Sequence, residues 1–254
     1  TVIVEDSVFD GCLGVGAIHL VGQSSSAGYA AEIRDCWFES NVSMVSSGAG
    51  VFVTLYSSAV VDGCTFMGNS SSQSGGAVFL TADTPNLLVT NCVFVGNCAD
   101  GRGGALYCGA HTVVSGNTLV GNLLRAPIGG GGSAIYFPYP GTATPQNNII
   151  ASTAGAAAID HNPLITVTSA CNVFWDNPDG IGIPLSTTDR IADPQFCDAT
   201  NGDFTVADSS PCLPANSNGC GQIGAFGQGC GAVSVESMSW GRIKAGFRRE
   251  EGGP

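Results

Sequence analysis

The sequence predicts an all-β solenoid, a single-stranded parallel β-helix in which each repeat forms one coil. Three observations support this fold class. Similar apolar runs recur at intervals of 24 to 31 residues, apolar and polar positions alternate within each run, and Gly or Asn interrupts the runs every eight to ten residues. A single copy is too short to bury its apolar side, so stacked copies must share one continuous core.

The first run of each repeat sets the number of coils. Seven copies read SVFDGC (7–12), CWFESN (36–41), CTFMGN (64–69), CVFVGN (92–97), NTLVGN (117–122), NIIAST (148–153) and NVFWDN (172–177). The alternation places two columns inside, one of Phe9, Phe38, Phe66, Phe94, Leu119, Ile150 and Phe174, the other of Ser7, Cys36, Cys64, Cys92, Asn117, Asn148 and Asn172. We therefore expect about seven coils, with matching residues stacked at strand spacing.

A polar column follows the first run. It contains Asn41, Asn69, Asn97, Asn122 and Asn177, with Cys12 and Thr153 at the two remaining positions. Asn tolerates left-handed backbone angles, and its amide both donates and accepts hydrogen bonds. We interpret the column as a structural ladder at a turn, in preference to a ligand site.

The second run supplies the candidate binding surface. It reads AIHL (17–20), GVFV (50–53), AVFL (77–80), ALYC (105–108), AIYF (134–137) and AIDH (158–161), and small residues such as Gly103-Gly104 precede it. The positions predicted to point outward hold His19, Phe52, Phe79, Tyr107, Tyr136 and Asp160. Five of these form an outward aromatic stripe suited to sugars. Two alternatives are that a turn or a partner chain covers the stripe, and that the in-out phase is wrong by one residue.

A third, weaker run leads into each next copy, for example AEIRD (31–35) and NLLVTN (86–91). The predicted organisation is therefore residues 1–178 as coils, 179–232 as a closing segment, and 233–254 as a tail. Trp240, Ile243 and Phe247 lie on one face of a helical projection of the tail. The tail is expected to be a short amphipathic helix or a disordered end, and attachment to the cell envelope is one hypothesis for its role.

Eleven cysteines indicate an oxidising compartment. We expect Cys36, Cys64 and Cys92 to be buried thiols, because in-register parallel positions hold Cβ atoms farther apart than a disulfide prefers. The expected bridges are Cys197–Cys212 and Cys220–Cys230, and Cys98 with Cys108 is a further pair to consider.

The charge distribution excludes one class of partner. Residues 1–232 hold four basic residues against seventeen acidic ones, so the body repels phosphate backbones and nucleic-acid binding is not expected. No apolar run approaches the 18 residues of a membrane span. The chain starts at Thr1 directly in a strand-like run, so we expect N-terminal coils to be missing.

The motifs FESN, FMGN and FVGN, together with GGAV and GGAL, resemble the repeats of polymorphic outer-membrane proteins. Residues 193–226, with DPQF, GDF, SPC and IGAF, are similar to the closing segment of secreted bacterial right-handed β-helix proteins of the choice-of-anchor-Q kind. The resemblance implies a right-handed, pectate-lyase-like solenoid that is secreted or displayed at the cell surface. It implies no chemistry.

A catalytic site is not evident in the sequence. GRIK (241–244) matches part of the polygalacturonase site, but the other motifs of that site are absent and the match lies outside the coils. Arg34 with Asp35 and Asp62 indicates a solvated edge, and the three histidines lie in different coils. Calcium at 176–180 or 198–203 remains a hypothesis, with Asn201-Gly202 more simply a hairpin turn, and regular outward Thr rows for an ice-binding face are lacking.

The leading hypothesis is therefore a non-catalytic extracellular scaffold that is adhesive or binds polysaccharide or cell-surface glycan, with no cofactor. The alternative is a polysaccharide lyase or glycoside hydrolase whose site lies in missing coils or on unassigned turns.

Overall fold

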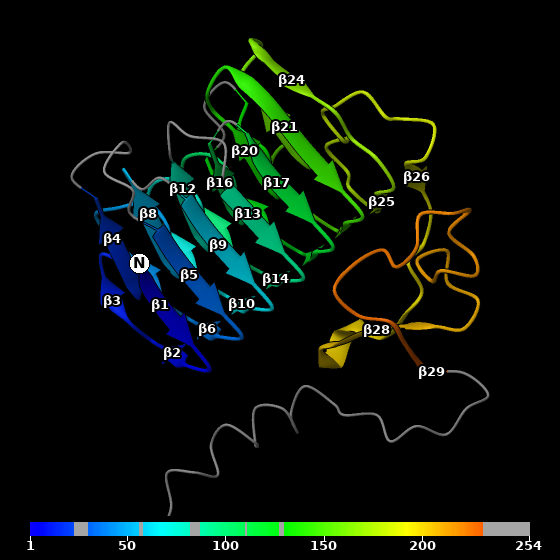
Figure 1. Cartoon of the computed structure of the whole chain (residues 1–254), viewed down its shortest axis with the longest axis horizontal. Coiled ribbons are helices and arrows are strands. Elements are labelled where there is room, and N and C mark those ends of the chain that lie inside the picture. The colour runs from blue at the N-terminus through cyan, green and yellow to red at the C-terminus, as the bar shows by residue number, and fades with distance from the viewer. Residues whose placement is uncertain (23–29, 56–57, 82–86, 110, 127–129, 231–254) are drawn as a thin grey trace, which may run out of the picture.

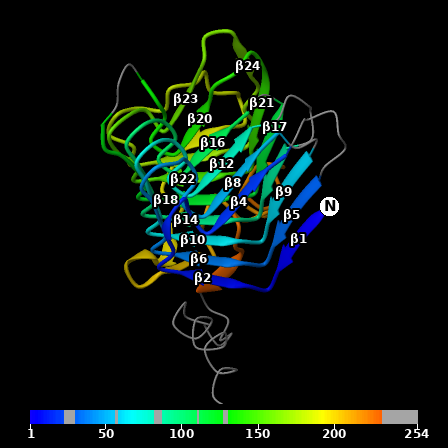
Figure 2. The same ribbon diagram turned by 90° about the vertical axis from the view of Figure 1, so that its left-hand side faces the viewer.

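The computed structural model describes residues 1–22, 30–55, 58–81, 87–109, 111–126 and 130–230. The described coils build four parallel sheets, and each sheet takes one strand from each successive coil (Figure 1). Figure 2 views the coils from the N-terminal end, where equivalent strands lie one behind another. The all-β solenoid predicted from the repeats is confirmed.

The first two sheets lie on either side of the turn that holds Cys36, Cys64 and Cys92. The first sheet consists of β1 (Val2–Glu5), β5 (Ala30–Arg34), β9 (Ser58–Asp62), β13 (Leu87–Thr90), β17 (Thr112–Ser115), β21 (Gly141–Gln146) and β24 (Ile165–Val167). The second consists of β2 (Val8–Asp10), β6 (Trp37–Glu39), β10 (Thr65–Met67), β14 (Val93–Val95), β18 (Thr118–Val120), β22 (Ile149–Ala151), β25 (Val173–Trp175) and β26 (Arg190–Ile191).

The other two sheets complete each coil. The third consists of two-residue strands, β3 (Leu13–Gly14), β7 (Val42–Ser43), β11 (Ser70–Ser71), β15 (Cys98–Ala99) and β19 (Leu123–Leu124). The fourth consists of β4 (Ile18–Val21), β8 (Val51–Thr54), β12 (Val78–Thr81), β16 (Leu106–Cys108), β20 (Ile135–Phe137) and β23 (Ile159–His161). The closing segment adds a small sheet of β27 (Phe196–Asp198), β28 (Asp203–Ala207) and β29 (Gln228–Cys230), with a 3-10 turn, η2 (Ala199–Asn201), between the first two.

Two features of the coils differ from the sequence prediction. The coil count is about six rather than seven, because the copy that begins at Asn172 contributes β25 to the second sheet and then leaves the coil path. Five of the coils also have a short fourth strand, where three strands per coil were expected. A strand of two residues is too short to show an alternating pattern, so the sequence could not reveal it.

The core is the predicted column of stacked rings. Ring centroids lie 4.9 Å apart for Phe9 and Phe38, 4.6 Å for Phe38 and Phe66, and 4.9 Å for Phe66 and Phe94, with planes within 6° of parallel. Phe38, Phe66 and Phe94 have no exposed surface. The register pairs these residues directly from coil to coil, so the inward assignment of this column is confirmed.

At the turn after the first run, the residue with a left-handed backbone conformation is not the expected Asn. In the fourth coil Gly96, with φ of 61°, takes this conformation, and the ladder residue Asn97 that follows it does not. Gly103 has φ of 68°, as predicted for the next corner. Gly104 is needed for space, because a Cβ there would lie 2.0 Å from the carbonyl oxygen of Ser133.

The closing segment lies across the outer face of the second sheet. Gly224 donates its backbone N–H to the Asn147 carbonyl at 2.7 Å, and Ala225 donates to Thr118 Oγ1 at 3.0 Å. Phe204 packs with Trp37 on this face. The outward positions of these strands are therefore buried: Trp37, Thr65, Val93, Thr118, Ile149 and Val173.

The predicted disulfide pairing is wrong. The bridges join Cys171 to Cys220 and Cys197 to Cys230, while Cys212 is a free, buried thiol. The prediction assumed that the closing segment folds on itself. It packs on the coils instead, which carries Cys220 to the turn at Cys171 and places Cys212 in the apolar layer with Ile149 and Val173.

The remaining thiols are unpaired. Cys36, Cys64 and Cys92 are buried and free, as expected. Cys98 and Cys108 are also free, so the further pair considered for them does not form. Within the described part of the chain, no helix has both the length and the apolar character needed to cross a bilayer. The hypotheses for the tail at 233–254 lie outside the described residues.

Candidate functional site

The outer face of the fourth sheet carries the aromatic stripe, defined as His19, Phe52, Phe79, Tyr107 and Tyr136. Register pairing links these five positions from coil to coil. Ring centroids are 5.0 Å apart for Phe52 and Phe79 and 4.5 Å for Phe79 and Tyr107, with planes within 13° of parallel. The fold therefore brings together all five residues that the sequence singled out as ligand-binding candidates.

The stacking decides which part of each ring is available. In the middle of the stripe, each ring covers the faces of its neighbours, so the ring edges point away from the sheet. The expected mode, in which a sugar stacks on a ring face, is thus unavailable at Phe79. Aromatic edges carry partial positive charge, so the row of edges favours contact with electronegative atoms such as hydroxyl and ring oxygens.

The two ends of the stripe differ. His19 is exposed and meets the Phe52 ring edge-on, with centroids 4.3 Å apart. At the other end, Tyr136 is only 6% exposed, although its position in the strand is an outward one. The Arg102 guanidinium carbon lies 4.9 Å from the centre of the Tyr136 ring, and Arg102 Nη1 donates to the Tyr136 hydroxyl at 2.9 Å. The accessible part of the stripe is therefore His19, Phe52, Phe79 and Tyr107.

Polar groups flank the accessible rings. Thr54 and Thr81 form the next outward column of the same sheet, and Thr81 Oγ1 donates to Thr54 Oγ1 at 2.9 Å. Burial raises the pKa of the Tyr107 hydroxyl, and its hydrogen bond with Tyr139 raises it further. Tyr107 therefore remains a neutral phenol at physiological pH and can share hydrogen bonds with a ligand.

From Asn41 to Asn122 the asparagine column forms a hydrogen-bonded ladder beside the third sheet. Asn41 Nδ2 donates to Asn69 Oδ1 at 2.8 Å, Asn69 Nδ2 to Asn97 Oδ1 at 2.9 Å, and Asn97 Nδ2 to Asn122 Oδ1 at 3.0 Å. Each of these side-chain amides also donates to the carbonyl of a Phe one coil back, as Asn97 does to Phe66. Asn177 closes the column by accepting from Thr153. These bonds use the amides within the protein, which fits a structural ladder.

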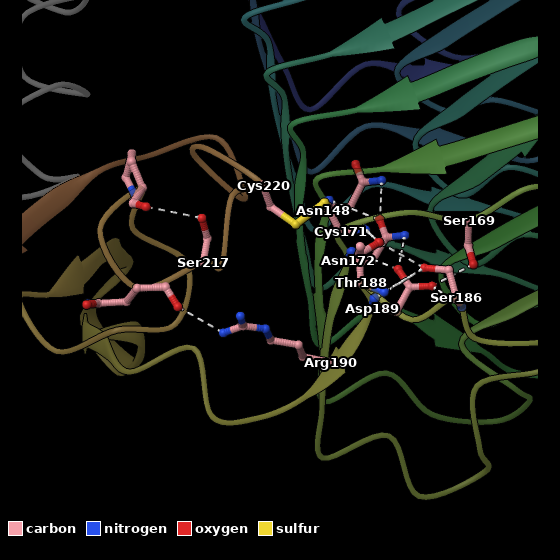
Figure 3. Close-up of a disulfide and its surroundings, with 12 residues drawn as sticks. Asn148, Ser169, Cys171, Asn172, Ser186, Thr188, Asp189, Arg190, Ser217 and Cys220 are labelled. Atoms are coloured by element: carbon pink, nitrogen blue, oxygen red, sulfur yellow. Dashed lines mark hydrogen bonds between the residues drawn. A yellow bond between two sulfur atoms is a disulfide. The ribbon is translucent and has the colours of Figure 1, made fainter.

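A second ladder, which the sequence analysis did not single out, runs up the other turn. Asn117 donates to Asn148, and Asn148 to Asn172. Asn172 donates both its backbone N–H and its side chain to Asp189 Oδ1, at 2.8 and 2.9 Å (Figure 3). The signal was visible as Asn at three equivalent positions, but Asp189 lies outside the repeats and could not be aligned with them.

Asp189 ends that ladder as a carboxylate. Burial acts to raise its pKa, but hydrogen bonds from Ser169 at 2.6 Å and from the backbone of Asn172 and Ser186 outweigh it and lower the pKa. The neighbouring Cys171–Cys220 bridge ties the closing segment to this end of the coils (Figure 3). The arrangement is a structural cap.

The arginine and two of the histidines that were considered as catalytic residues interact with other groups of the protein. Arg34 forms ion pairs with Glu32 at 3.0 Å, Asp62 at 3.6 Å and Glu5 at 3.9 Å, at the edge of the first sheet. His111 Nδ1 lies 3.1 Å from Thr142 Oγ1, and His161 Nδ1 lies 2.9 Å from the Asn162 carbonyl.

The two segments considered for calcium are also engaged within the chain. Asp179 accepts from the Gly155 backbone, and Asp198 caps η2 by accepting from Asn201. Gly202 is left-handed in the antiparallel turn between β27 and β28, as the hairpin interpretation predicts. Among the described residues, no group of three or more His, Cys, Asp or Glu could hold a metal ion. Calcium binding stays an untested hypothesis.

The sequence also matches a known family. Residues 1–193 match the family model described as "Right handed beta helix region". No curated protein and no solved structure matches the chain. The matched region covers most of the chain and coincides with the stacked parallel strands of the four sheets, so the chain belongs to the right-handed β-helix family.

Proposed function

We propose that this protein is a non-catalytic, extracellular scaffold that binds glycan, on a cell surface or in a polysaccharide matrix, through the aromatic stripe. The observation that supports this proposal best is the stacked row of Phe52, Phe79 and Tyr107 on an outer sheet face, where all three rings are partly exposed. A contiguous row of partly exposed aromatic rings is typical of an interaction site.

The shape and chemistry of the stripe favour an extended, oxygen-rich ligand. The rings follow the long axis of the solenoid at strand spacing, so a linear chain can contact several coils at once. Its oxygen atoms would meet the positive ring edges, and its hydroxyls could bond with Thr54 and Thr81 beside the rings. A glycan chain combines these two properties.

The cysteines support an extracellular location. Two disulfides hold the closing segment, and disulfides persist in oxidising compartments. The five thiols at Cys36, Cys64, Cys92, Cys108 and Cys212 are buried, which protects them from oxidation there. A secreted or surface-displayed bacterial protein is consistent with these features.

The test is a binding measurement on a panel of neutral and acidic polysaccharides. The double variant Phe79→Ser/Tyr107→Ser should bind at least about tenfold more weakly than the parent, a loss of about 1.4 kcal/mol. The matched control is Leu88→Ser, which removes an exposed apolar side chain from the outer face of the first sheet and should bind like the parent. Thermal unfolding of each variant checks that the coils remain folded.

Two results would reject the proposal. One is a parent protein that binds nothing on the panel, and the other is a double variant that binds as the parent does. Release of reducing sugars by the parent on the same panel would favour the catalytic alternative, a lyase or hydrolase, over the scaffold.

A further inference from the structure

Arg102 differs from Arg34 and Arg125, the other two arginines within residues 1–178, in having no acidic partner. Arg34 pairs with three carboxylates and Arg125 with Asp100, at 2.6 Å. Arg102 has no ion pair with any described residue, and its side chain is exposed. In a body with seventeen acidic residues, an arginine left without a carboxylate needs a physical explanation.

The Arg102 side chain is nevertheless held in one position. Its guanidinium lies over the Tyr136 ring, with the carbon atom 4.9 Å from the ring centre, and Nη1 donates to the Tyr136 hydroxyl. A guanidinium has five N–H donors arranged in a planar fork, and this contact uses one of them. The remaining donors are preorganised to bind a carboxylate or sulfate without the entropy cost of ordering a free side chain.

The acidic residue that follows Tyr136 along the stripe column does not form an ion pair with Arg102. Asp160 is the register partner of Tyr136 in the next coil. Its Oδ2 accepts from the Gly131 backbone at 2.6 Å, and its Oδ1 accepts from the His161 backbone at 2.7 Å. Both carboxylate oxygens are therefore engaged by the backbone, and Arg102 keeps its charge at the end of the aromatic stripe.

We infer that Arg102 binds a single anionic substituent, a carboxylate or a sulfate, of the glycan that lies along the aromatic stripe. This inference rests on the proposed function. The ligand would be sparsely charged, because the acidic body repels a dense polyanion such as polygalacturonate while one substituent at Arg102 gains charge-assisted hydrogen bonds.

The test compares three forms of the same glycans with the full chain. Cellulose, xylan, mannan and dextran are presented as neutral polymers, as lightly carboxymethylated derivatives and as lightly sulfated derivatives. The parent should bind at least one carboxymethylated or sulfated form about tenfold more tightly than its neutral counterpart, and the two derivatives show which anion is preferred. Polygalacturonate should bind more weakly than the sparsely charged forms.

Three variants separate charge from geometry. Arg102→Gln should lose the preference for the anionic form and keep the affinity for the neutral one, and Arg102→Lys should keep only part of the preference, because a lysine lacks the planar fork. Arg125→Gln removes an exposed arginine that is already paired with Asp100, and should change nothing.

The outcomes distinguish the inference from the proposed function. A parent that binds the neutral and anionic forms equally, or an Arg102→Gln variant that keeps the preference, overturns the inference and leaves the glycan scaffold in place. A parent that binds no form of any of the four glycans overturns both.

Discussion

Asn97 carries the ladder at the middle of the solenoid, and its loss should destabilise the fold strongly. Its Oδ1 accepts from the backbone and side chain of Asn69, and its Nδ2 donates to Phe66 and Asn122. The substitution Asn97→Ala leaves two Asn69 donors without an acceptor at a site with no exposed surface. Each such buried group costs about 1–3 kcal/mol, so the free energy of unfolding should fall by about 2–6 kcal/mol.

Urea unfolding followed by far-UV circular dichroism measures this loss. The control Ser72→Ala changes an exposed side chain just after β11, one coil earlier, and should stay within about 0.5 kcal/mol of the parent. If the Asn97→Ala variant unfolds with the same free energy as that control, the ladder does not stabilise the coils and the reasoning is refuted.

The variant Asn97→Asp tests the amide nitrogen separately. It keeps the oxygen that accepts from Asn69, but places a carboxyl against the acceptors of Phe66 and Asn122. These contacts favour the protonated form, so the new carboxyl should have a folded pKa above its unfolded value of about 3.9. Relative to the parent, the variant should be most stable below that value and should lose stability as the pH rises through the folded pKa.

Three further predictions concern the closing segment and the thiols. Hydrogen bonds lower the pKa of Asp189, so its contribution to the free energy of unfolding is present above about pH 3.9 and is lost as the pH falls through the folded pKa. The substitution Asp189→Asn should remove that acid dependence and lower the free energy of unfolding by about 1–3 kcal/mol at neutral pH. Urea unfolding at a series of pH values measures both effects. Maleimide labelling of the native protein should modify Cys12 and Cys98 first, with the five buried thiols reacting only after denaturation. The double variant Cys171→Ser/Cys220→Ser removes a disulfide between residues 49 positions apart and should lower the free energy of unfolding by up to about 4 kcal/mol. It should also bind more of an apolar dye, because the outer face of the second sheet is uncovered. Unchanged dye binding would contradict the packing of the closing segment on that sheet.

The coils were predictable because their residue pattern repeats along the sequence. Equivalent positions such as Phe38, Phe66 and Phe94 repeat at nearly constant spacing, so one alignment assigns the core, the ladder and the stripe together. The closing segment has no repeat. Its bridges depend on where it packs, and neither the contact between Phe204 and Trp37 nor the link from Cys220 to Cys171 has a local sequence signal.

The sequence predicted which residues form the candidate site, but not how their rings are arranged. The period of two placed His19, Phe52, Phe79 and Tyr107 outside, and these residues are the less buried positions of their strands. The sequence could not show that neighbouring rings would cover one another's faces, since that depends on side-chain rotamers. Nor could it place Arg102 on Tyr136, because the two residues are 34 positions apart in different coils.

The internal and external ring columns have the same stacking geometry but different reasons to exist. Ring centroids are 4.6 to 4.9 Å apart in the inner column and 4.5 to 5.0 Å apart between Phe52 and Tyr107 in the outer one. The stacking distance therefore does not distinguish the two columns. The inner column is explained by burial of apolar surface. An outward strand position has no such requirement, as Arg34 and its acidic neighbours show on the first sheet. Apolar rings at half-buried outward positions, next to an arginine without a carboxylate, are therefore better explained by what they contact in solution than by what they contribute to folding.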